Sequence, residues 1–278
     1  MKSKMLPRMA SMLAVWTVLL VWQLSAPHLG GLGLLVFLLL LAWPISMAGA
    51  ESVFCRRHAF RSEYLAGRSW LYRLMGMEPL VLAVEAGKGL VLAALLMTVA
   101  LSLNLRGWAV WLLDVLILAM LMPRLPGLLA DAVKRTYLFA LARRWAIWLS
   151  TLLLWLESVS VLLLRGGDDY RGLSWQEALA YSMPDGRLAA DGLVDAMVRS
   201  YAGMQGLAGW SLSVLADGAD LAMRLEALLA LGAVALLWLL VALAYSRALI
   251  GALARPLAIW RPRPRRRAGG DVLEAWWL

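Results

Sequence analysis

Six long apolar runs are the feature of this sequence that most restricts its fold. A helix needs about 20 apolar residues to cross a bilayer, because the hydrocarbon core tolerates only a backbone that satisfies its own hydrogen bonds. The pattern predicts an all-α integral membrane protein with about six transmembrane helices. Some runs are short, so an alternative is that they form hairpins that do not cross the membrane fully. The third run has an alternative start near Pro79. The runs are Met9–Ser25, Leu32–Met47, Leu90–Leu105, Trp108–Met122, Trp145–Leu164 and Ala227–Leu249.

The composition favours a membrane protein over a soluble domain. Hydrophobic residues make up 62% of the chain, charged residues make up 16%, and the mean hydropathy is +0.73. The basic start, with Lys2, Lys4 and Arg8, resembles a signal peptide. No small-residue cleavage pattern follows it, so we expect the first apolar run to be retained. The single cysteine, Cys55, has no partner in this chain for a disulfide.

The distribution of basic residues predicts an orientation. If the runs cross alternately, 21 of the 27 lysines and arginines lie on one side of the membrane and six on the other. Basic residues near membrane spans remain in the cytoplasm. We therefore expect a bacterial inner-membrane protein with both termini in the cytoplasm. This orientation explains the net charge of +9 better than nucleic-acid binding does.

The expected organisation alternates apolar hairpins with basic segments. A helical extracytoplasmic insertion, residues 165–226, is predicted between the fifth and sixth spans. The full predicted order is an N-terminal hairpin (1–50), a basic interfacial cytoplasmic segment (51–88), a second hairpin (89–122), a basic cytoplasmic segment (123–144), a third hairpin that contains the insertion (145–250) and a basic Pro/Arg cytoplasmic tail (251–278).

The insertion has the sequence pattern of helices. Ser174 and Glu177 fit a capping box, which predicts a short helix, and Met183–Gly186 is typical of a turn. A second helix is expected after the turn, weakened by the three glycines between 203 and 209, which also permit close packing. Its apolar stripe is expected to lie on the membrane surface or on a partner. The candidate partner-interface residues are Leu188, Val194, Met197, Tyr201 and Met204.

Tryptophan positions support the same threading, because an indole ring prefers the headgroup level of a membrane. Trp155 lies inside a predicted span, where helix packing explains its presence. The expected inner margin holds Trp43, Trp145, Trp148 and Trp260, and the expected outer margin holds Trp108, Trp111, Trp175 and Trp210.

Two inner segments resemble each other. In each, an acid and a valine are followed by a cluster of basic and aromatic residues, Arg56–Phe60 in one and Lys134–Phe139 in the other. One interpretation is a repeated unit, and the other is chance similarity in a biased composition. Apolar side chains alternate with arginines at helical spacing, which favours anchoring in the headgroup plane over docking of a cytoplasmic partner.

Asp114 and Glu157 lie within predicted spans. A charged group near the bilayer centre costs about 2.5–3.5 kcal/mol on insertion scales. One hypothesis makes these acids a proton or cation relay. The alternative is a helix-packing hydrogen bond, for example to Asn104, Ser150 or Ser158. The sequence favours the alternative, because no intramembrane base and no broken helix accompanies the two acids.

The C-terminal tail combines prolines with a dense run of arginines, which suits binding to anionic lipid headgroups. Nucleic acid is the alternative anion, but few aromatic rings interleave with these arginines, so the sequence does not favour it. The predicted lipid contacts are Arg261, Arg263, Arg265, Arg266 and Arg267.

The sequence contains no catalytic constellation, zinc-ligand spacing or phosphate-binding loop. We therefore expect no enzyme activity and no cofactor. The favoured hypothesis is a non-catalytic structural or assembly subunit of a multi-protein inner-membrane complex, such as a secretion or conjugation apparatus. Its partners would be membrane lipids and other membrane or periplasmic subunits. The alternative is a small channel or ion-coupled transporter that uses Asp114 and Glu157, and an enzyme acting on a lipid-linked substrate ranks third.

Overall fold

The computed structural model describes residues 5–64, 78–164, 170, 172–184, 186, 191–217 and 220–254. These residues form helices, turns and connections, with no strand among them. Five of the helices are long and apolar enough to cross a membrane. The predicted helical class is confirmed, and the five helices are compatible with a multi-pass membrane protein.

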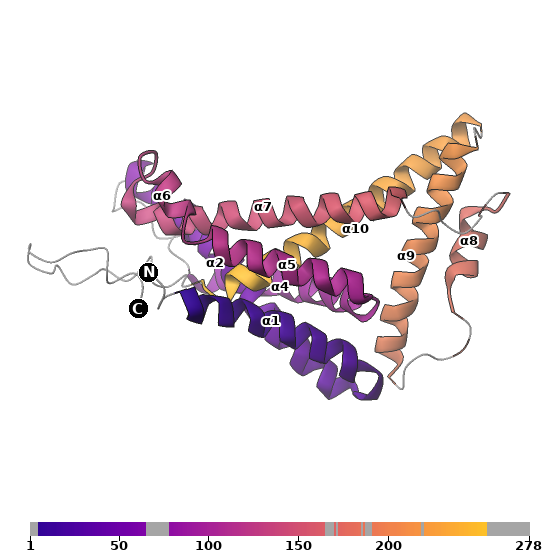
Figure 1. Cartoon of the computed structure of the whole chain (residues 1–278), viewed down its shortest axis with the longest axis horizontal. Helices are drawn as coiled ribbons and strands as arrows, with labels where there is room; N and C mark the ends of the chain where they lie inside the picture. Colours follow the sequence, from indigo (N-terminus) through magenta and orange to yellow (C-terminus); the bar gives the residue numbers. More distant parts are fainter. Residues whose placement is uncertain are drawn as a thin grey trace, which may run out of the picture.

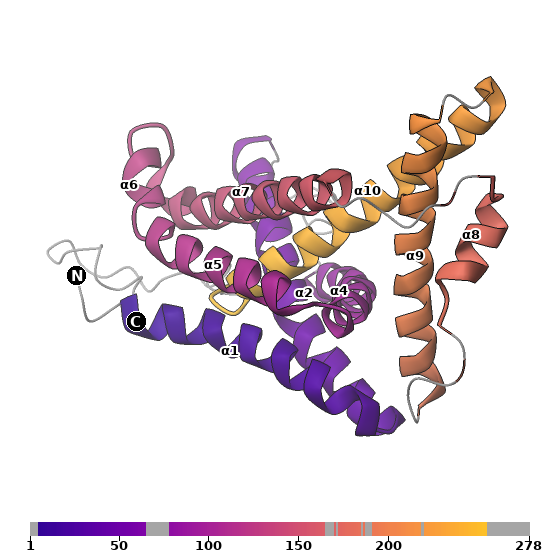
Figure 2. The same ribbon diagram turned by 45° about the vertical axis from the view of Figure 1, so that its right-hand side comes forward.

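Most of the long helices lie side by side as a bundle, and two helices lie across one end of it (Figure 1). A second view shows the same arrangement (Figure 2). The bundle helices are α1 (Met5–Ser25), α2 (Gly31–Tyr64), α4 (Glu78–Leu101), α5 (Leu105–Leu121), α7 (Arg135–Leu164) and α10 (Leu221–Gly251). The crossing helices are α8 (Trp175–Ser182) and α9 (Gly192–Ala216), and short connections are formed by η2 (Ala26–His28) and α6 (Leu125–Leu129). We call the two ends of the bundle the α6 end and the α9 end.

Helix α5 is the one bundle helix outside the set of five that could cross a membrane. Its 17 residues give a length of about 26 Å, slightly less than the hydrocarbon core of a bilayer. Asp114, Val115 and Leu118 of α5 are nevertheless buried among the other helices. The bundle therefore contains all of the apolar runs found in the sequence.

Two helices extend beyond the apolar runs that predicted them. Helix α2 continues through Pro44 to Tyr64, across the boundary expected between residues 50 and 51. Its 34 residues, about 50 Å of helix, are longer than the hydrocarbon core of a bilayer is thick. Helix α4 begins at Glu78, beside Pro79, which agrees with the alternative early start. Proline is well suited to the first turn of a helix, where its missing N–H has no partner to lose.

Small residues bring α2 into close contact with α4 and α10. A Cβ on Gly89 would lie 2.9 Å from the carbonyl oxygen of Ala42, and a Cβ on Gly251 would collide with the carbonyl group of Pro44. Close approach of backbones at glycine is a common device in membrane helices, because association there depends on packing rather than on exclusion of water.

Two tryptophans expected at the outer margin are buried in the core of the bundle. Trp108 and Trp111 are buried, and their rings belong to an aromatic row that runs from Trp16 to Tyr245. The Tyr245 hydroxyl donates a hydrogen bond to the carbonyl of Trp111 at 2.7 Å. Their place at the outer margin of a membrane stays a prediction, since burial against other helices does not fix the depth of a ring in the bilayer. Trp155 does pack between helices, as expected, and its indole N–H donates to the carbonyl of Ala235 at 2.9 Å.

The crossing helices confirm most of the local signals in the insertion. Ser174 and Glu177 form the predicted capping box at the start of α8. Helix α9 is continuous through its three glycines, contrary to the expected weakening. The expected close packing is present, because a Cβ on Gly206 would lie 3.0 Å from the carbonyl oxygen of Ala178 in α8. Packing against α8 thus compensates for the low helix propensity of glycine.

Candidate functional site

A buried polar cluster lies where α5, α7 and α10 meet. Asp114 is 4% exposed, and Ser150 donates a hydrogen bond to its Oδ2 at 2.8 Å. The Ser150 hydroxyl lies 2.7 Å from that of Ser246, and the Ser246 hydroxyl donates to the carbonyl oxygen of Ala242 at 2.8 Å. The two hydroxyl groups thus form a short polar chain from the Asp114 carboxyl group of α5 to the backbone of α10. The expected helix-packing hydrogen bond to Ser150 is confirmed.

The other polar residues of these spans have separate roles. Asn104 caps the first turn of α5, and Ser158 donates to a carbonyl of its own helix. Glu157 is half-buried on α7, nearer the α9 end, where it is attracted electrostatically to Arg106. The structure therefore does not bring Glu157 into one cluster with Asp114.

The stripe predicted as a partner interface on α9 faces the bundle. Val194 is buried in the main core, and Met197 and Tyr201 pack against that core. The ring of Tyr201 meets that of Trp238 edge to face, with 6.3 Å between the centroids. Met204 is partly buried, and Leu188 lies outside the described residues. The role of this stripe in partner binding remains a prediction. Other helices of the same chain already bury much of the stripe.

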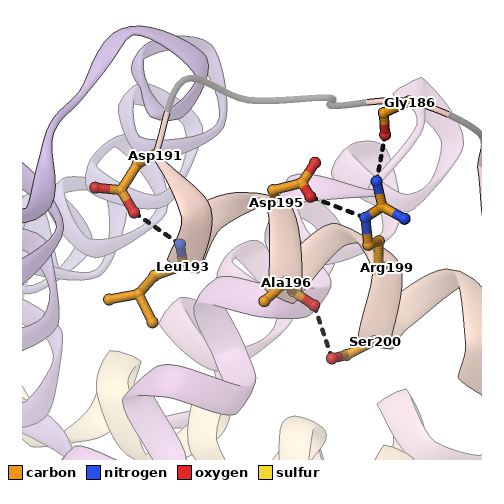
Figure 3. Close-up of polar contacts among 7 residues, drawn as sticks. All are labelled: Gly186, Asp191, Leu193, Asp195, Ala196, Arg199 and Ser200. Carbon is orange, nitrogen blue, oxygen red and sulfur yellow. Dashed lines mark hydrogen bonds and ion pairs between the residues drawn. The ribbon is translucent and has the colours of Figure 1, made fainter.

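Polar contacts tie the start of α9 to the turn before it (Figure 3). Asp191 caps the helix by accepting a hydrogen bond from the backbone N–H of Leu193 at 2.8 Å. Arg199 donates from Nε to Asp195 Oδ2 at 2.8 Å and from a second nitrogen to the carbonyl of Gly186. Gly186 has a φ of +79°, which explains a glycine in the predicted turn.

The first half of α10 is apolar and poorly covered. Leu221 is 86% exposed, Leu225 is 59% exposed and Leu229 is 67% exposed. Figure 1 shows the start of α10 beside the end of α9, projecting beyond the ends of α5 and α7. From the contact between Trp155 and Ala235 onward, α10 returns to the bundle. These leucines form an exposed surface at the α9 end, which we call the α10 leucine face.

A pocket of about 190 Å³ opens near the α6 end between α2, α7 and α10. Glu51 of α2 is buried at one wall and pairs with Arg143 of α7. The Arg143 Nε donates to Glu51 Oε2 at 2.8 Å, and a second guanidinium nitrogen donates to Oε1. This two-point ion pair joins α2 to α7 and is the polar link that sequence reasoning missed. The charged lining consists of Glu51, Arg56, Arg143, Arg144 and Arg247.

The two inner segments that resemble each other are in direct contact. The Nδ1 of His58, on α2, lies 3.0 Å from the hydroxyl of Tyr137, on α7, within hydrogen-bond distance. Their rings also meet edge to face. The shared pattern in sequence was the available signal, although it did not predict that the two segments would face each other. The tail arginines from Arg261 to Arg267 lie outside the described residues.

No protein-family model, curated protein or solved structure matches this chain. The fold and the sites define a class, a helical-bundle protein with several helices that could cross a membrane. Because a fold alone does not specify a function, the function must be argued from the sites.

Proposed function

We propose that this protein is a non-catalytic structural or assembly subunit of a multi-protein complex in a bacterial inner membrane. In this proposal six helices cross the membrane, both termini are cytoplasmic, and α8 and α9 lie on the outer side. A secretion or conjugation apparatus is the kind of complex that we have in mind. The observation that carries the proposal is the α10 leucine face at the α9 end.

In this proposal, the α10 leucine face requires contact with another apolar surface where it leaves the membrane. Helix α10 has 31 residues, about 46 Å, which is longer than the hydrocarbon core of about 30 Å. Tilting accommodates part of the excess. The start of α10 nevertheless projects past α5 and α7 (Figure 1). In this proposal Leu221 and Leu225, in the first turns of α10, therefore lie at or beyond the outer surface. Exposed apolar patches of this kind favour protein contacts.

A copurification experiment tests this proposal. We expect Leu225→Ala together with Leu229→Ala to release copurifying proteins after mild detergent extraction, because the change removes much of the apolar area that a partner would bury. Leu39→Ala with Leu40→Ala is the matched control, since these leucines are similarly exposed on α2, within the bundle. Both variants should insert normally. Identical sets of copurifying proteins from the two variants would remove the basis for an assembly role at this face.

The second candidate function, a small channel or ion-coupled transporter, is favoured by one observation, the buried cluster around Asp114. Intramembrane acids of this kind often mark ion pathways. If Asp114 serves helix packing, Asp114→Asn should preserve function, since an amide can donate to Ser150 and accept as well. Loss of ion flux in proteoliposomes with Asp114→Asn or Glu157→Gln, in a variant that still assembles, would favour the transporter.

A further inference from the structure

We propose that the pocket between α2, α7 and α10 binds the phosphate headgroup of an anionic lipid. Four arginines line the pocket against a single glutamate, Glu51. Since Glu51 already pairs with Arg143, the lining holds no second acid to neutralise Arg56 and Arg144. The charge of Arg247 is attracted to Glu85, which lies outside the lining. The site is separate from the C-terminal tail and does not depend on the proposed assembly role.

Like charges are crowded around this pocket. Arg247 is attracted to Glu85 but lies close enough to Arg56 for electrostatic repulsion. Arg8, near the start of α1, in turn repels Arg143. An anion between the arginines would relieve this repulsion. A guanidinium group offers several N–H donors in a planar fork, which matches the oxygens of a phosphate.

The remaining walls of the pocket favour a lipid over a soluble anion. Ile147, Trp148 and Leu243 line the pocket beside the arginines. Trp148 is 53% exposed, and Leu152, one turn further along α7, is also exposed. An acyl chain can therefore follow the outer face of α7 while the phosphate remains among the arginines. An indole ring at this position is typical of the headgroup level of a membrane.

The dimensions and position of the pocket agree with this ligand. A volume of about 190 Å³ is smaller than the usual pocket for a cofactor or drug-sized molecule, about 300–1,000 Å³, and suits a single headgroup. The pocket lies near the α6 end, which the distribution of basic residues assigns to the cytoplasmic side. Basic pockets between membrane helices on that side bind phosphorylated headgroups.

Lipid titration of the full chain in mild detergent, followed by native mass spectrometry, tests the proposal. The probes are phosphatidylglycerol and phosphatidylcholine with identical acyl chains. We expect phosphatidylglycerol to bind about tenfold more tightly or better. Arg56→Gln with Arg144→Gln should abolish this preference while leaving the Glu51–Arg143 pair in place.

Arg57→Gln with Arg124→Gln is the matched control, because it removes the same charge from the same end outside the pocket lining. This control should retain the preference for phosphatidylglycerol. Circular dichroism checks the helix content of each variant, and Arg144→Gln alone should weaken phosphatidylglycerol binding about fivefold if the double variant misfolds.

Three results would overturn the proposal. The first is equal binding of the two lipids by the unchanged protein. The second is an equal loss of preference in the pocket variant and in the control, which would indicate a diffuse charge effect. The third is competition by inorganic phosphate at the same concentration as the lipid, which would make the pocket a site for soluble anions.

Discussion

Single polar side chains join helices at two places in the bundle. Ser150 links Asp114 of α5 to Ser246 of α10, and Arg143 of α7 holds the buried carboxylate of Glu51. A buried polar group that loses its partner costs more than an ordinary hydrogen bond contributes, because its desolvation is no longer compensated. Removing one partner from either pair should therefore destabilise the protein by more than the loss of an exposed hydrogen bond would.

The first residue-level prediction concerns Ser150. Ser150→Ala should lower the free energy of unfolding by about 1–3 kcal/mol, since it leaves Asp114 buried without this partner. Ser160→Ala, on the same helix, should change it by less than about 0.5 kcal/mol, because the exposed Ser160 donates its hydrogen bond to a carbonyl of its own helix. Thermal unfolding in detergent measures both, and equal effects would contradict the role assigned to the cluster.

A second residue-level prediction concerns pH. Hydrogen bonds from the backbone N–H and hydroxyl of Ser174 lower the pKa of Glu177 below its usual value. A lowered pKa in the folded state means that the cap contributes stability above the unfolded pKa and loses it as pH falls through the folded pKa. Amide exchange in the first turn of α8 should therefore accelerate relative to Glu177→Gln as the solution becomes acidic. A constant ratio of the two exchange rates across that range would argue against the capping box.

At the level of elements, glycines decide how closely helices approach. Two glycines of α10 have very different surroundings. Gly251 lies against the backbone of Pro44, whereas a Cβ added to Gly232 would have no neighbouring atom within 4 Å. A methyl group is therefore excluded at one end of the helix and tolerated in its middle.

This contrast gives an element-level prediction. Gly251→Ala should destabilise the protein by about 1–3 kcal/mol, because α10 must move away from α2 to make room. Gly232→Ala, in the same helix, should be neutral or stabilising by up to about 1 kcal/mol, since alanine is the better helix former. Unfolding in detergent would compare them, and a destabilisation of similar size in both would refute close α2–α10 contact at Gly251.

The whole molecule combines a helical bundle with a layer of two helices across the α9 end (Figure 1). The charged pocket near the α6 end and the α10 leucine face at the α9 end lie far apart along the bundle. The lipid site and the partner surface proposed for them can therefore be tested independently.

Membrane topology is the prediction at this scale, and α5 is the decisive helix. With α5 crossing the membrane, a reporter fused after Ala130 should be cytoplasmic and one fused at Gly186 should be external. If α5 does not cross while α1, α2 and α4 do, both results are reversed, because every later segment changes sides. Paired reporters that are active on opposite sides of the membrane distinguish the two outcomes.

The sequence by itself determined the helical class, the positions of the apolar helices and the local signals. The capping box of Ser174 and Glu177 is an example, because it depends on residues three positions apart. Ser150 could also be named as one of three candidate partners for Asp114, since polar groups are scarce within apolar runs. Helix ends were less well predicted, because α2 continues as a regular helix after its apolar run stops.

The tertiary structure alone decided which apolar faces meet. In a membrane protein, lipid-facing and helix-facing residues are both apolar, so periodicity does not separate them. The same stripe pattern on α9 would suit a partner, a lipid surface or the bundle, and Val194 proved to lie in the core. The burial of Trp108 and Trp111 was not predicted for the same reason. The pair of Glu51 with Arg143 joins residues 92 positions apart, a separation at which local sequence patterns carry no information about contact.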